Sequence, residues 1–95
     1  MTDRTLLPND ERADLATRLS DWQVDGDYLR RSWAFTDFAE AFAFMTQVAD
    51  VAAALQHPPA WSNAWHRVEI AVTTHSNGGL TRLDLAFAEA VDALL

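Results

Sequence analysis

The sequence predicts an α+β fold whose elements follow the order α-β-β-α-β-β-α. Three segments, near the start, in the middle and at the end of the chain, space their apolar residues as one face of a helix does. Between them lie two pairs of short segments in which apolar and polar residues alternate, as in half-buried strands. A chain of 95 residues with no linker or internal repeat suits a single domain spanning residues 1–95.

The first half of the chain predicts a helix followed by a β-hairpin. Residues 8–20 begin with a proline and acidic residues, which favour the first turn of a helix. Trp22 to Val24 alternates apolar and polar residues, and Asp25-Gly26-Asp27 is typical of a hairpin turn. Tyr28 to Phe35 is rich in strand-forming residues, so we expect it to be the second strand.

The longest predicted element is a helix from Thr36 or Asp37 to about Leu55. Asp37 followed three positions later by Glu40 is a capping-box pattern. Two apolar stripes run along this helix, one formed by Phe38, Phe42, Met45, Val48, Ala52 and Leu55, the other by Phe44 and Val51 beside Ala41. One stripe should cover a sheet, and so small a domain has little left to cover the second. We expect the second face to contact a neighbouring subunit; the alternative is a loop of the same chain.

The stretch from Gln56 to Asp84 contains all three histidines, two of the four tryptophans and two of the three glycines. His57-Pro58-Pro59 should end the long helix, because a residue before proline avoids the helical region. Trp61 to Trp65 predicts a short strand or extended turn. Arg67 to Thr74 alternates cleanly and predicts a strand with Val68, Ile70 and Val72 on one face.

The last predicted element is an amphipathic helix. The chain reaches it through a turn that starts at His75 and contains Gly78 and Gly79, which can take positive φ. Thr81 with Asp84 three residues later is a second capping pair. The apolar face is then formed by Leu83, Phe87, Ala90, Val91 and Leu94.

Composition argues against several classes of function. The net charge is −7, and the seven basic residues are all arginines scattered along the chain, so neither nucleic acid nor an anionic membrane is an expected partner. The absence of cysteine rules out disulfides and thiolate metal sites, and fits a reducing compartment. The polar N-terminus does not resemble a signal peptide, and no apolar run approaches the ~20 residues that span a bilayer. We therefore expect a cytoplasmic protein.

The histidines are the candidate reactive groups. His57, His66 and His75 are nine residues apart, a spacing that pairs none of them on a helix face, so we expect no metal site. His66 at a strand entrance is typical of a surface residue. His57 and His75 lie at element ends, where sites are commonly built, and histidine exchanges protons near neutral pH. Because a strand advances ~3.3 Å per residue, only a bent or paired path could bring them together. Alternatively, both only cap and brace the fold.

The same stretch resembles the pterin-4a-carbinolamine dehydratase family. The residues that carry the resemblance are His57-Pro58-Pro59, Trp61, Asn63, Trp65, Val68, Thr74-His75, Gly79-Leu80 and Asp84, with Trp22, Phe38 and Phe44-Met45 upstream. The resemblance covers nearly the whole chain. It implies a four-stranded antiparallel sheet with the helices on one face, and a homodimer or homotetramer assembled partly through the long helix.

The resemblance also implies an activity. The family dehydrates 4a-hydroxytetrahydropterin to quinonoid dihydropterin, in the recycling of the pterin, and needs no metal or organic cofactor. His57 and His75 would be the acid–base pair, one protonating the departing 4a-hydroxyl and the other handling the ring-nitrogen proton. The pterin would be lined by His57, Pro58, Pro59, Thr74, His75, Ser76 and Asn77, with Trp61, Trp65 and Asp84 in support.

Two residues depart from the pattern of the family. Pro58 stands where a second histidine or an asparagine usually follows the first histidine, and Ala53 stands where an acidic residue is usual. Both changes predict weaker proton transfer, so we expect reduced activity. The alternative is a dehydratase-like protein that has lost turnover and acts in binding or assembly, as some members of the family do.

Overall fold

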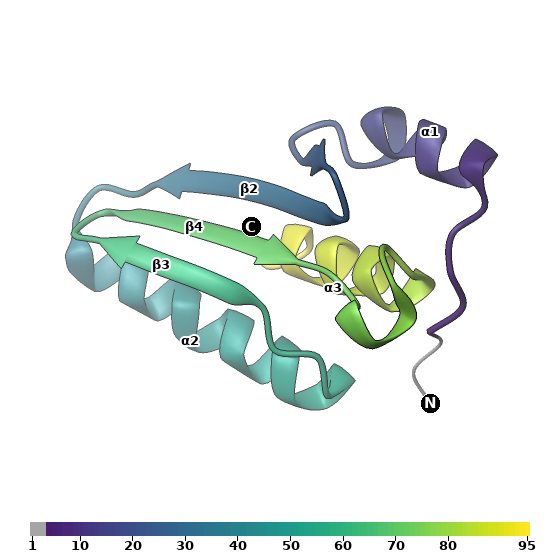
Figure 1. Ribbon diagram of the computed structural model, residues 1–95. Coiled ribbons are helices and arrows are strands. Elements are labelled where there is room, and N and C mark those ends of the chain that lie inside the picture. The colour runs from purple at the N-terminus through teal and green to yellow at the C-terminus, as the bar shows by residue number, and fades with distance from the viewer. Residues whose placement is uncertain (1–3) are drawn as a thin grey trace.

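The computed structural model describes residues 4–95 as one four-stranded sheet with three helices (Figure 1). The strands are β1 (Gln23–Asp25), β2 (Tyr28–Ala34), β3 (Ala60–Ala64) and β4 (Arg67–Val72), all antiparallel and ordered β1-β2-β4-β3 across the sheet. The helices are α1 (Asn9–Arg18), α2 (Phe38–Leu55) and α3 (Arg82–Asp92). The predicted fold class and the predicted element order are both confirmed.

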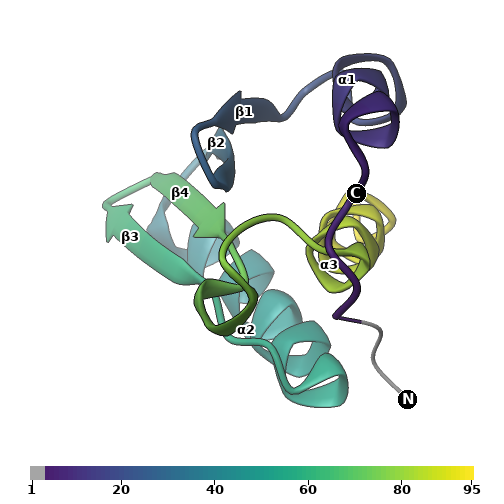
Figure 2. The same ribbon diagram turned by 45° about the vertical axis from the view of Figure 1, so that its right-hand side comes forward.

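The core lies between the sheet and the helices. Figure 2 shows α2 and α3 under one face of the sheet, with α1 beyond the β1 edge on the same side. Leu29 pairs with Val72 and Trp33 pairs with Val68, so these apolar side chains share the helix-facing side of β2 and β4. They pack against buried residues of the two helices, among them Phe44, Val48, Phe87 and Val91.

Several elements are shorter than the sequence predicts. α1 ends at Arg18 and not near Ser20. Trp22 lies outside β1, because its buried indole Nε1 donates to Asp92 at 2.8 Å and ties this segment to the end of α3. β4 ends at Val72, so the two threonines that follow leave the sheet and enter the candidate site.

The two faces of α2 are arranged differently from the sequence prediction. The buried stripe is Ala41, Phe44, Val48 and Ala52, whereas Phe38 and Phe42 are 48% and 55% exposed. The stripe of six residues that the sequence predicts therefore contains residues from both faces: Val48 and Ala52 are buried, whereas Phe38 and Phe42 are exposed. Apolar spacing alone does not show which of these residues meet the sheet. The prediction of a second apolar face is confirmed, and no described segment covers those two phenylalanines.

By length and composition alone, α2 is long and apolar enough to cross a membrane, because it has 18 residues and a mean hydropathy of 1.3. In the folded protein, 22% of this helix is buried. The sequence analysis expected no such segment. One side of the helix packs on the sheet as a core helix does, through Phe44 and Val48. The low buried fraction reflects the other side, which runs uncovered from Phe38 towards the C-terminal end of the helix.

Candidate active site

His57 is positioned by the end of α2. Gln56 takes a left-handed conformation with φ 52° and ψ 44°, and the His57 N–H donates to the carbonyl of Ala52 at 2.9 Å. The chain thereby turns the imidazole inward, where it is only 7% exposed. Its Nε2 lies 2.5 Å from Oδ1 of Asp84, which is completely buried. The pair forms a short, water-excluded hydrogen bond.

Asp84 also lies in the first turn of α3. Its Oδ2 accepts hydrogen bonds from the backbone N–H of Thr81 and the hydroxyl of Thr74, both at 2.8 Å. The Thr81 side chain completes the predicted capping box by accepting from the backbone N–H of Asp84, and it also accepts from the N–H of Leu83 at 3.2 Å. One carboxylate therefore fixes the helix start and the orientation of His57. The sequence identified Asp84 both as a cap and as a supporting site residue, and the structure shows why one side chain can do both.

The two histidines lie at the same end of the β3–β4 hairpin. His57 precedes β3 and His75 follows β4, and because the two strands are antiparallel their outer ends meet. The link is continuous: Asp84 joins His57 to Thr74, the residue directly before His75. The paired path that the sequence analysis required is therefore a hairpin, closed at this end by a buried carboxylate.

His75 occupies a very different environment. It begins a short 3₁₀ turn, His75–Asn77, and is exposed. The turn ends at Gly78, which has φ 81°. The hydroxyl of Tyr28 lies 2.9 Å from Nε2 of His75. Sequence reasoning missed Tyr28; the available signal was that this residue, the only tyrosine of the chain, directly follows the Asp25-Gly26-Asp27 turn.

An open apolar hollow of about 540 Å³ lies beside His57, between the end of α2 and the start of β3. It is lined by Ala49, Ala52, Ala53, Gln56, Pro58, Pro59 and Trp61. Both departures from the family pattern, Ala53 and Pro58, therefore face one space. Where the family pattern would supply a carboxylate and an imidazole or amide, this chain supplies a methyl group and a pyrrolidine ring.

The N-terminal segment joins the two histidine segments. The guanidinium of Arg4 donates to the carbonyl of Gln56 at 3.3 Å, and the side-chain amide of Asn77 donates to the carbonyl of Arg4 at 2.5 Å. Further along, Leu7 donates to the carbonyl of Leu80 through its backbone N–H. We call residues 4–7 the N-terminal strap.

The other predicted site residues divide into two groups. Ser76 and Asn77 lie in the turn of His75, and Trp61 lines the hollow with Pro58 and Pro59. Trp65 does not join them: it occupies the β3–β4 turn at the opposite end of the hairpin and is 76% exposed.

Trp65 belongs to the hairpin turn by its backbone. Its φ of 57° lies in the left-handed region, and the Asn63 side chain donates to its carbonyl at 3.0 Å. Neighbouring His66 is half-buried, and its carbonyl accepts from the N–H of Phe35 at 2.8 Å. The spacing of Trp65 from the histidines therefore reflects the length of the hairpin.

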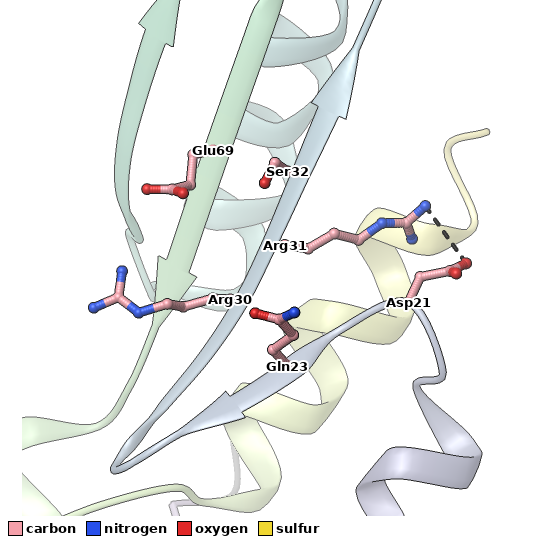
Figure 3. A pocket seen from close by; sticks show the side chains of 6 residues that line it. All are labelled: Asp21, Gln23, Arg30, Arg31, Ser32 and Glu69. Atoms are coloured by element: carbon pink, nitrogen blue, oxygen red, sulfur yellow. Dashed lines mark ion pairs between the residues drawn. The ribbon is translucent and has the colours of Figure 1, made fainter.

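A second hollow lies on the helix-free side of the sheet and is lined by none of the histidines (Figure 3). It measures about 220 Å³ and is lined by Asp21, Gln23, Arg30, Arg31, Ser32 and Glu69. Both of its arginines are already paired, Arg30 with Asp25 at 2.7 Å and Arg31 with Asp92 at 2.8 Å. Among residues 4–95, no group of three or more histidine, aspartate or glutamate side chains is arranged to hold a metal ion.

The fold and the site together define a class of protein: a small α+β protein in which a buried carboxylate holds one of two histidines at the end of an antiparallel hairpin. A model of the family described as pterin 4 alpha carbinolamine dehydratase matches residues 5–94. The chain belongs to this family, as the sequence resemblance predicted.

Relatives extend over nearly the whole chain. A protein of Synechococcus sp. (strain WH7803) is 53% identical over 90 residues, covering 95% of this chain and 97% of the relative. One of Rhizorhabdus wittichii is 51% identical and covers 93% of each chain. Both carry the name "Putative pterin-4-alpha-carbinolamine dehydratase".

Two solved structures share the fold. The crystal structure of a transcriptional coactivator/pterin dehydratase from Brucella melitensis matches with a TM-score of 0.87 and 40% identity, over 95% of this chain and 98% of that one. A pterin dehydratase-like protein, identified as a RuBisCO assembly factor in the α-carboxysome, matches with a TM-score of 0.63 and 26% identity. It covers 77% of this chain and 84% of that chain.

Proposed function

We propose that this protein dehydrates a 4a-hydroxytetrahydropterin to the quinonoid dihydropterin in the cytoplasm, by histidine acid–base catalysis without a metal or organic cofactor. The observation that carries the proposal is the buried His57–Asp84 hydrogen bond of 2.5 Å, linked through Thr74 to the segment of His75. A carboxylate that holds an imidazole in one orientation prepares it for directed proton transfer. Membership of the family and the names of the relatives support the same reaction.

The reaction needs two proton transfers. One histidine protonates the departing 4a-hydroxyl, and the other takes the proton from the ring nitrogen as the new C=N bond forms. In the proposal, Pro58 and Pro59 shape one wall of the pterin site and Thr74 to Asn77 shape the other. General acid–base catalysis contributes typically ~10²–10⁴-fold, so losing one of the two groups should remove most of the acceleration.

The test is the rate of carbinolamine dehydration in the presence of the purified protein. We expect clear acceleration over the spontaneous reaction, and loss of most of it in His57→Gln and in His75→Gln. The control is Ser32→Ala, on the helix-free side of the sheet. If both histidine variants dehydrate the substrate as fast as the unaltered protein, the proposed mechanism is wrong.

A second function is favoured by the apolar hollow. With Ala53 and Pro58 lining it, the hollow offers contacts to an apolar side chain of a protein partner rather than to a polar ring. The relative identified as a RuBisCO assembly factor shows that a protein of this fold can serve in assembly. In this second candidate function, the chain folds normally, shows no turnover and binds a protein through the hollow.

One variant separates the two functions. Pro58→His restores the histidine that usually follows the first histidine in the family pattern and leaves Ala53 unchanged. If the protein is a dehydratase with reduced activity, turnover in this variant should rise by ~10-fold or more, a part of the usual acid–base contribution. If neither form accelerates dehydration although both fold, the assembly function is preferred.

The uncovered face of α2 supports self-association. Phe38, Phe42, Met45, Ala49 and Ala53 recur at the spacing of one helix face, with exposed aromatic rings at one end and the small residues of the hollow at the other. Two antiparallel copies of α2 with their twofold axis between Met45 and Thr46 would set Phe38 against Ala53 and Phe42 against Ala49 of the second copy. We propose this isologous pairing as the homodimer contact.

The pairing predicts a specific failure. Ala53→Phe fills the position that receives Phe38 from the second copy, and Phe42→Glu places a charge in an apolar contact. Both should lower the mass measured by light scattering from that of an oligomer to that of a monomer. Thr17→Glu, on the exposed surface of α1, is the matched control. If the unaltered protein is a monomer in solution, the proposed pairing is wrong. The dehydration assay does not depend on this result and tests the proposed reaction separately.

A further inference from the structure

The β3–β4 hairpin lies along α2, so its two ends meet opposite ends of that helix (Figure 1). At the start of α2, a hollow of about 410 Å³ is lined by Trp65 and His66 of the hairpin turn and by residues 35–37. At the end of α2 lies the hollow of about 540 Å³ beside His57, which is lined in part by Trp61. Each subunit therefore carries an aromatic turn at one end of α2 and an apolar hollow at the other.

Trp65 is exposed without a local reason. With 76% of its surface open to solvent, it is the most exposed large apolar side chain among residues 4–95. Within the same residues, the only aromatic ring that it meets is that of His66, with the centroids 6.4 Å apart. A tryptophan that the fold leaves in water is typical of a residue that anchors a contact between protein chains.

The two ends of α2 also carry opposite charges that their own chain does not pair. Asp37 caps the start of the helix by accepting from the N–H of Glu40 at 2.8 Å. Arg4 reaches the carbonyl of Gln56 at the other end. Within residues 4–95 neither Asp37 nor Arg4 forms an ion pair, although five of the seven arginines pair with a carboxylate. An antiparallel second copy would bring each of these charges its missing partner.

The antiparallel pairing of α2 proposed above brings these ends together. The symmetry that sets Phe38 against Ala53 also sets position 37 of one subunit opposite position 54 of the other, next to the wall of the hollow. The aromatic turn of each subunit then lies at the hollow of the second subunit. Trp65, at the opposite end of the hairpin from the histidines of its own chain, thereby comes beside His57 of the other chain.

We infer that each active site of the homodimer is completed by the second subunit: Trp65 closes the hollow beside His57 as a wall for the pterin ring, and Asp37 pairs with Arg4 to hold the turn in place. The inference rests on the proposed homodimer for its geometry and on the proposed dehydration for its substrate. A flat indole offers stacking area to the flat pterin ring, and a closed hollow keeps water away from the proton transfers.

The first test locates Trp65 and needs no turnover. The chain contains no cysteine, so Trp65→Cys combined with Pro59→Cys introduces the only two thiols. Within one chain these positions flank β3, and a bismaleimide linker shorter than that strand should join them only between subunits, giving a covalent dimer on a denaturing gel. Ser32→Cys with Pro59→Cys is the matched control, and neither it nor a single-cysteine variant should form the dimer. No covalent dimer from a protein that is dimeric by light scattering would overturn the inference.

The second test is kinetic complementation at low substrate concentration. His57→Gln and Trp65→Ala should each lower turnover, the latter through a KM raised by ~10-fold or more, as expected for a lost stacking partner. When equal amounts are unfolded and refolded together, one site in each mixed dimer combines an intact His57 with an intact Trp65. With random pairing, the mixture should recover about a quarter of the turnover of the unaltered protein. Turnover at the mean of the two parent variants would overturn the inference.

The ion pair has its own test. Asp37→Asn keeps the helix cap, because asparagine caps as well as aspartate does, and removes the charge. It should raise the dissociation constant of the dimer by roughly fivefold, whereas Asp14→Asn on the exposed surface of α1 should leave it unchanged. Equal dissociation constants for these two variants would contradict the pairing of Asp37 with Arg4.

The failure of this inference can be told apart from the failure of the proposed reaction. A monomeric unaltered protein would contradict the inference, and the dehydration assay would still decide the reaction. A dimer that forms the covalent link without any turnover would contradict the dehydration and support the placement of Trp65 beside His57 of the second subunit.

Discussion

The two histidines of this protein lie at one end of the same hairpin, yet their surroundings differ in almost every respect. His57 is nearly buried and its partner Asp84 is part of the core, held by a helix cap and a threonine. His75 is exposed, follows the sheet in a short turn, and meets one phenol at the surface. The comparison teaches that one fold can place one of two neighbouring histidines in its interior and the other at its surface.

This division has a physical reason. A buried carboxylate must have its hydrogen-bond donors supplied by the protein, so changes near His57 affect folding and chemistry together. The His75 ring stays in contact with water, which can replace a lost partner at little cost in free energy. Stability measurements should therefore separate the two regions even where activity measurements do not.

The largest effect should follow from Asp84→Ala. The change leaves the Thr81 N–H and Nε2 of His57 without an acceptor, whereas the Thr74 hydroxyl keeps the Thr81 hydroxyl as a partner, and each buried group left unpaired costs ~1–3 kcal/mol. We expect the free energy of unfolding to fall by ~3 kcal/mol or more, measured by urea denaturation. Asp84→Asn keeps the shape of the side chain and one acceptor oxygen, so its free energy of unfolding should fall clearly less than that of Asp84→Ala. Equal losses in the two variants would show that only volume matters at this position.

A direct comparison of His57→Ala with His75→Ala is the next most sensitive test. The first removes a donor from a buried carboxylate and should cost ~1–3 kcal/mol of stability. The second removes an exposed ring and should stay within ~0.5 kcal/mol. Both should nevertheless reduce dehydration. Similar urea midpoints for the two variants would contradict the division between interior and surface.

Gly78→Ala tests whether the left-handed backbone at the end of the His75–Asn77 turn affects the stability of the protein. No atom lies within 4 Å of the position a Cβ would take, so the only penalty is the φ of 81°. A left-handed conformation costs a residue with a Cβ ~1–2 kcal/mol, and we expect a stability loss of about 1 kcal/mol. The matched control is Ser76→Ala in the same turn, which has no such penalty. A loss in the control as large as in Gly78→Ala would exclude backbone strain as the cause.

The smallest effect should come from the N-terminal strap. Arg4→Ala removes the hydrogen bond from the guanidinium to the carbonyl of Gln56, and a typical net contribution is ~0.5–1.5 kcal/mol, less at the surface. We expect ~0.5 kcal/mol, together with faster amide hydrogen exchange at His57 and at Asn77. Faster exchange at only one of these positions would mean that the strap does not join the two segments.

Local patterns in the sequence were sufficient to predict the type and order of the elements, although not all of their ends. The Asp37 and Thr81 caps and the glycine turn depend on contacts between near neighbours, and each is found where it was predicted. The sequence left open which side of α2 is buried, because both of its stripes are apolar and only packing on the sheet distinguishes them. Trp65 was grouped with the site through the family resemblance, and the hairpin carries it to the end opposite the two histidines.

The sequence by itself determined the element order, the two histidines at element ends and the membership of a family, because these depend on spacing and residue type. Tertiary structure decided which groups meet. Asp84 is 27 positions from His57, and Tyr28 is 47 positions from His75, so neither contact follows from a local pattern. The sheet order β1-β2-β4-β3 brings the start of β2 beside the end of β4, and this pairing places the phenol of Tyr28 against His75, whereas the first turn of α3 supplies the carboxylate that meets His57.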